Sequence, residues 1–120
     1  MVTVGQIREL ALSLPRTEEA LVRDRVKFRV RGLVYLALSR DETELGFAYP
    51  KLERDALIES EPDLFFMPIP SDERFNWVRA HLAVLEPDRM AELVIDAWRM
   101  VVPKGVAAAY LAGHRSTSLD

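Results

Sequence analysis

The sequence predicts a small α+β domain in which an antiparallel sheet carries helices on one face. Apolar and cationic side chains alternate from residue 25 to residue 31, the two-residue period of a strand with one buried face. The turn pair Arg31-Gly32 and the uncharged run 33–38 follow, as in a hairpin. Apolar residues recur at helical spacing between Met90 and Val101, which indicates an amphipathic helix.

The first half of the chain is predicted to form a helix and a three-stranded meander. Thr3 is a good N-cap, with Gln6 at the spacing of a capping box, and Pro15 ends the helix. A polar connector at 17–24 leads into the sheet, with residues 20–22 compatible with a short extended piece. We expect a helix at about 3–13 and strands at 25–31, 33–39 and 45–49.

The second half is predicted to form a helix, two strands and two helices. Pro50 suits the first turn of a helix, and Pro103 separates the last two helices. Gly113 is expected to end the final helix. The inward residues of the first of these helices are expected to be Leu52, Ala56 and Leu57. We expect a helix at 51–59, a short or edge strand at 64–67, a strand at 75–84, and helices beginning at 87 and 104.

The predicted architecture is a single two-layer domain at 1–113 with a flexible polar tail at 114–120. The element order is helix, three strands, helix, two strands, helix, helix. The apolar stripe of the helix that begins at Pro87, which includes Trp98, is expected to lie in the core.

Composition excludes several classes of function. The formal net charge of −3 argues against a general nucleic-acid binder but allows a local basic patch. The chain has no cysteine, so disulfides, thiol catalysis and cysteine zinc sites are excluded. Its two histidines lack a metal-binding spacing, and no nucleophile elbow, phosphate-binding loop or dinucleotide fingerprint is present. We expect a cytoplasmic protein without cofactor, metal, membrane span or catalytic activity.

The first candidate site is a cationic strand face. Alternate residues of a strand lie about 6.6 Å apart, which can match successive phosphates, and arginine offers a fork of donors. The alternative is the solvated face of a half-covered sheet, neutralised by Glu18, Glu19, Glu42 or Glu44. The candidate nucleic-acid contacts are Arg25, Lys27, Arg29 and Arg31, joined by Arg79 and Lys104.

Lys104 belongs to this set because it follows Pro103 at a helix start, where free N–H groups can hold an anion. The alternative is a simple helix break with an exposed lysine. A second candidate is a ligand groove with aromatic and cationic walls, formed by Tyr35, Phe75, Trp77 and His81. The alternative there is a tryptophan that packs on the sheet beneath the stem of Arg79.

The chain resembles the MmcQ/YjbR-like family over most of its length. The resemblance rests on Leu-Ala-Leu-Ser-Leu-Pro at 10–15, Phe-Arg-Val-Arg-Gly at 28–32, Trp-Val-Arg at 77–79, Leu-Val-Ile-Asp-Ala-Trp-Arg at 93–99 and Val-Pro-Lys at 102–104. It implies a small α+β domain in the CyaY-like or secretion-chaperone-like structural neighbourhood, commonly labelled DNA-binding and without a catalytic motif. The chain departs from the family pattern at three places where a basic residue is common: Leu33, Gly105 and Tyr49-Pro50. All three departures reduce the positive charge.

Three functions follow as hypotheses. The first is a module that binds DNA through phosphate contacts of strand 25–31, weakly and with strong dependence on salt. The second is a protein-interaction or self-association module at Phe65-Phe66-Met67-Pro68, where an edge strand could accept another strand. The third is an enzyme, which would need a pocket lined by Trp77, Arg79 and His81.

Overall fold

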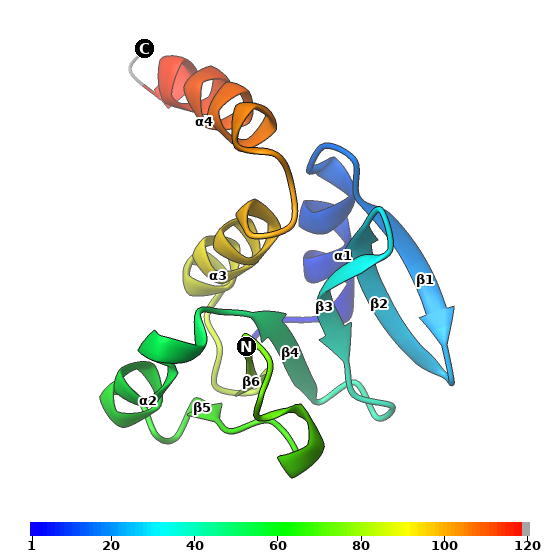
Figure 1. The fold of residues 1–120 in the computed structure, drawn as a ribbon, viewed down its shortest axis with the longest axis vertical. Helices are drawn as coiled ribbons and strands as arrows, with labels where there is room; N and C mark the ends of the chain where they lie inside the picture. Colours follow the sequence, from blue (N-terminus) through cyan, green and yellow to red (C-terminus); the bar gives the residue numbers. More distant parts are fainter. Residues whose placement is uncertain (119–120) are drawn as a thin grey trace.

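The structure is a computed structural model that describes residues 1–118, and side chains as far as residue 113. This part of the chain has four α-helices and one sheet, and Figure 1 shows the last helix projecting away from the sheet. In chain order the elements are α1 (Val4–Ser13), β1 (Glu18–Val22), β2 (Arg25–Val30), β3 (Leu33–Leu38), β4 (Glu44–Ala48), α2 (Lys51–Ser60), β5 (Phe65–Phe66), the 3-10 helix η1 (Pro70–Asp72), β6 (Trp77–His81), α3 (Pro87–Arg99) and α4 (Lys104–Ser118).

The sheet has six strands among the described residues, all antiparallel, in the order β1-β2-β3-β4-β6-β5. The predicted α+β class is therefore confirmed, but four strands precede α2 where three were expected. The additional strand, β1, lies within the segment predicted as a connector and includes the short extended piece expected at 20–22. It pairs with β2 through a turn at Arg23 and Asp24, whose φ angles are 53° and 65°. Such two-residue hairpin turns usually contain Asn-Gly, so this one carries no sequence signal.

Two other predicted boundaries also differ from the structure. The strand predicted at 75–84 is limited to β6, Trp77–His81. Gly113 does not end the last helix, because α4 continues to Ser118; a glycine inside a helix costs only about 1 kcal/mol. The predicted tail at 114–120 is thus helical as far as Ser118, and residues 119–120 lie outside the described part. The predicted edge position of the 64–67 segment is confirmed, since β5 ends the sheet.

The core lies between α1, α3 and one face of the sheet. α3 contacts α1, β3 and β4, whereas α2 contacts β5 and β6 at the other end of the sheet (Figure 1). The predicted apolar stripe of α3 is buried, including Trp98, whose indole N–H donates to the Pro15 carbonyl at 2.9 Å. No helix in the described range is long and apolar enough to span a membrane.

Candidate functional site

The sheet face opposite α1 and α3, here called the outer face, has small residues along its middle. Lys27 of β2, Ala37 of β3, Gly46 of β4 and Arg79 of β6 lie in one row across the sheet. Ala48, two residues beyond Gly46, faces the same way. Ala37 and Ala48 leave a low floor between longer side chains on either side, whereas the Trp77 indole covers Gly46.

This floor belongs to a hollow of about 520 Å³, here called the outer trough. One wall carries Arg25 and Lys27 of β2, and another carries Phe75 and Trp77. Asp72 of η1 also lines the hollow, as do Met100 and Val101 after α3. The Phe75 side chain is 50% exposed. The trough therefore combines cations, aromatic rings and one carboxylate around an apolar floor.

Trp77 is placed by the glycine beneath it. A Cβ atom on Gly46 would lie 2.6 Å from the indole Nε1 of Trp77, so only glycine leaves room for the ring there. The indole is partly buried against the sheet, as the packing interpretation expected, and it also borders the trough. Its N–H donates to no group in the described part of the chain.

Two of the predicted phosphate contacts are neutralised within the protein. Arg29 Nε lies 2.7 Å from Glu18 Oε1 on the neighbouring strand. Arg79 Nε donates to the Met67 carbonyl at 2.9 Å, and its Nη1 lies 3.4 Å from Glu44 Oε1. The alternative interpretation had named both Glu18 and Glu44 as neutralising partners. These two arginines are therefore engaged in contacts within the sheet.

Four predicted cations have no ion-pair partner among residues 1–113. Arg25 and Lys27 stand on the wall of the outer trough. Arg31 lies just beyond the end of β2, in the hairpin turn, with a φ of 52°. Lys104 is exposed at the start of α4 and lines a different hollow. The predicted row of four cations is thus divided into a free pair, a paired arginine and a turn residue.

The predicted aromatic groove is only partly assembled. Phe75 and Trp77 share the trough, but His81 stacks on Phe66, with ring centroids 4.2 Å apart, and does not line it. The Arg79 guanidinium lies 4.4 Å from the centroid of the Phe66 ring. Its cation–π contact is therefore with Phe66 and not with Trp77.

Tyr35 is buried in the core, which corrects its prediction as a groove residue. The β2–β3 register shifts between Phe28 and Arg29, so that Tyr35 and Leu36 both point inward and the simple alternation fails. The Tyr35 hydroxyl lies 2.8 Å from Thr17 Oγ1. Burial raises the pKa of Tyr35 to about 12, partly opposed by this hydrogen bond.

Arg54 of α2 supports the aromatic wall, and no feature of the sequence predicted it. Its side chain is only 5% exposed, whereas Leu52 and Ala56, predicted to face inward, are exposed. Nη1 donates to the carbonyls of Phe75 and Trp77 at 3.2 and 3.1 Å, and Nη2 to that of Glu73 at 2.9 Å. α2 turns this arginine inward because the neighbouring backbone carbonyls need donors.

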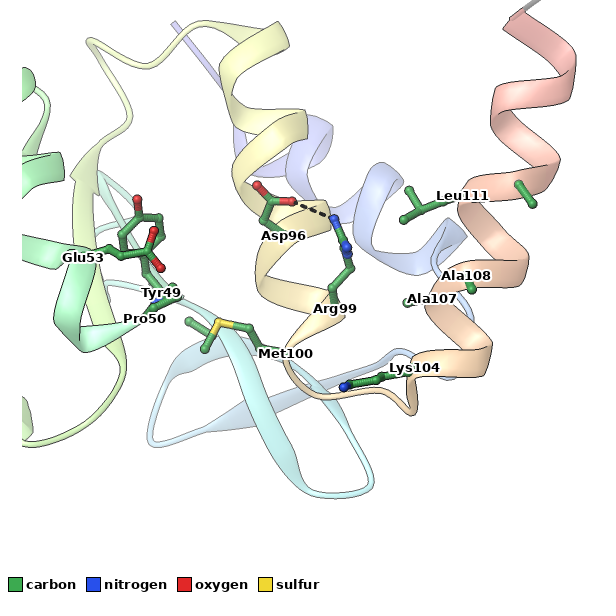
Figure 2. Close-up of a pocket in the computed structure, with 12 residues that line it drawn as sticks. Tyr49, Pro50, Glu53, Asp96, Arg99, Met100, Lys104, Ala107, Ala108 and Leu111 are labelled. Atoms are coloured by element: carbon green, nitrogen blue, oxygen red, sulfur yellow. Dashed lines mark ion pairs between the residues drawn. The ribbon is translucent and has the colours of Figure 1, made fainter.

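A larger hollow, of about 920 Å³, lies between α3, α4 and the start of α2. Figure 2 shows charged side chains from these helices around it: Glu53, Asp96, Arg99 and Lys104. Asp96 pairs with Arg99 at 3.7 Å, and burial raises the pKa of Asp96, which Arg99 partly opposes. No histidine, serine, threonine or cysteine lines it within the described chain.

The remaining titratable side chains do not gather into a metal site. Over the described residues, no group of three or more His, Asp or Glu side chains could hold a metal ion. The outer trough, with its free cations and aromatic wall, is therefore the candidate functional site.

Comparisons with known proteins agree with the fold. No curated protein matched the chain. The chain is similar in structure to Deinococcus radiodurans protein DR2400, described as a DUF419 domain, with a TM-score of 0.74 and 20% sequence identity over 88% of this chain and 82% of that one. This likeness concerns the fold alone. The family model named YjbR matches residues 12–100. The chain therefore belongs to the YjbR family.

Proposed function

We propose that the chain is a non-catalytic binding domain that contacts DNA through its outer face. Arg25 and Lys27 hold phosphate oxygens in this proposal, with Arg31 in the turn that follows β2 as a third contact. The observation that carries it is the pair Arg25 and Lys27, which has no ion-pair partner in the described chain and stands beside an aromatic-walled trough. Cations without internal partners are available to phosphates, whereas paired ones must first be released.

The contact is expected to be weak and to depend on salt. At most three phosphates are neutralised, which predicts a slope of about −2 to −3 when log affinity is plotted against log salt concentration. The net charge of −3 adds a general repulsion between the protein and DNA. Arg29 and Arg79 contribute little in this proposal, because both are held by contacts within the sheet.

Fluorescence anisotropy of labelled DNA at about 50 and about 200 mM salt tests the proposal. We expect binding at low salt that Arg25→Glu/Lys27→Glu abolishes. The control is Arg16→Glu/Arg99→Glu, which makes the same change in net charge at two residues that do not line the trough. Absence of binding at low salt, or equal losses in both double variants, would contradict the proposal.

The alternative is a protein or self-interaction at Phe65-Phe66-Met67-Pro68. Its support is the position of β5 at the edge of the sheet, where a partner strand could pair. Phe65 is buried, and the Phe66 ring contacts both Arg79 and His81, so this edge offers backbone groups more than apolar anchors. Light scattering tests self-association: a monomer at all accessible concentrations would count against a dimer.

A further inference from the structure

We propose that the outer trough takes one unpaired base of single-stranded DNA, so that the protein prefers single strands to duplex. This inference rests on the DNA contact proposed above and names the form of DNA that the site recognises. It follows from the shape of the trough, from its aromatic wall and from the arrangement of its charges.

The shape fits a single planar group. Ala37 and Ala48 form a low floor, and the backbones of β2 and β6 lie three strand spacings apart, about 14 Å. The volume of about 520 Å³ is within the usual range for sites that bury a small molecule. In a duplex the bases are stacked and present only their edges in the grooves. A base must therefore be unpaired to reach this floor.

The Trp77 indole and the backbone that carries both aromatic residues are held in place before any ligand arrives. Gly46 provides the space for the Trp77 indole, and Arg54 donates to the carbonyls of both Phe75 and Trp77. Aromatic side chains that are already fixed lose little conformational freedom when a base stacks on them. Stacking on such side chains depends little on base identity, because every base has a π-face.

The charges give the strand an orientation across the trough. Arg25 and Lys27 on β2 attract the phosphate. Asp72 lines the same hollow, where its carboxylate repels phosphate and can accept a hydrogen bond from a base. The phosphate is therefore placed at β2, and the base over the floor toward Trp77.

The test compares three probes: a labelled single strand of mixed sequence, the same strand in a duplex, and free deoxyadenosine monophosphate. We expect the single strand to bind about tenfold more tightly than the duplex, and to quench the fluorescence of Trp77. Trp98, the other tryptophan, is buried and serves as the internal background. Trp77→Leu should weaken single-strand binding about tenfold, leave duplex binding unchanged and abolish the quenching, while Trp77→Phe retains most of the affinity.

Phe75→Ala provides a second variant, because this half-exposed side chain can be removed with little effect on folding. It should also weaken binding of the single strand but not of the duplex. Equal affinity for single strand and duplex, with Arg25→Glu/Lys27→Glu still abolishing both, would overturn this inference and leave the proposed DNA contact standing. Free nucleotide that binds as tightly as the strand would also overturn it. Loss of all nucleic-acid binding would overturn both proposals together.

Discussion

Removing the Arg54 guanidinium should destabilise the protein and loosen the backbone that carries Phe75 and Trp77 in the outer trough. The side chain is 5% exposed and bridges α2 to the segment that leads into β6. Its donors reach the carbonyls of Glu73, Phe75 and Trp77 at 2.9–3.2 Å. Arg54→Met keeps much of the apolar stem and removes all three hydrogen bonds.

The loss in free energy of unfolding expected for Arg54→Met is the difference between opposing contributions. Hydrogen bonds from a charged donor contribute about 1.5–3 kcal/mol each, so the three together contribute about 5–9 kcal/mol. Burying the cation costs several kcal/mol, and the buried Nε has no partner in the described chain, which adds to that cost. Methionine avoids both costs but leaves three carbonyls unpaired. We therefore expect Arg54→Met to lower the free energy of unfolding by about 2–4 kcal/mol.

Urea unfolding followed by far-UV circular dichroism measures this loss. Lys51→Met is the matched control, because it removes an exposed cation from the same helix and should change the free energy by less than about 0.5 kcal/mol. Arg54→Lys should fall between the two, since a single ammonium cannot reproduce the fork of donors. The reasoning is refuted if Arg54→Met costs no more than Lys51→Met.

Three further predictions concern the β1–β2 turn, the glycine beneath Trp77 and the buried hydroxyl of Tyr35. Arg23→Asn/Asp24→Gly should relieve the strain of two positive φ angles and raise the melting temperature by several degrees; an unchanged value would contradict it. Gly46→Ala should cost about 1–3 kcal/mol, because its Cβ meets the Trp77 indole, and a double-mutant cycle with Trp77→Leu should recover most of that loss. Folding raises the pKa of Tyr35 to about 12 from 10.0. The neutral phenol therefore contributes its full share to the free energy of unfolding below pH 10. That share, about 2–3 kcal/mol, is lost as the pH rises to 12, so Tyr35→Phe should weaken the alkaline dependence of urea unfolding.

Features that depend on neighbours in sequence were predicted correctly. The capping box is present: the Thr3 N–H donates to Gln6 Oε1 at 2.8 Å, and the Gln6 N–H donates to Thr3 Oγ1 at 3.2 Å. The turn at Arg31-Gly32 has both φ angles positive, as a two-residue hairpin turn requires. Each of these features is encoded within about four residues, the range over which spacing rules apply.

Features that depend on contacts between different elements were not predicted. β1 exists because Glu18–Val22 pairs with β2, although its turn lacks glycine and asparagine. Tyr35 faces inward because of a register shift against β2, which alternation cannot reveal. Arg54 is buried because carbonyls some twenty residues away accept its hydrogen bonds. In each case the deciding partner lies in another element.

The floor of the trough had a signal that could have been recognised. Glycine inside a strand often marks the close approach of another group, and Gly46 lies inside the strand predicted at 45–49. Together with Ala37 and Ala48, it places small residues at outward positions of two strands that the predicted meander already made neighbours. The sequence alone could not bring Trp77 over that floor, because β6 joins β4 only after α2 and β5.

The register between β1 and β2 decides which cations are free. Alternation correctly puts Arg25, Lys27 and Arg29 on one face, but it cannot distinguish them. Pairing sets Glu18 opposite Arg29, whereas the apolar residues Ala20 and Val22 stand opposite Lys27 and Arg25. A cation opposite an apolar residue gains no cross-strand ion pair, and its charge stays available to a ligand. The strand predicted as a connector thus selects the two cations that border the trough.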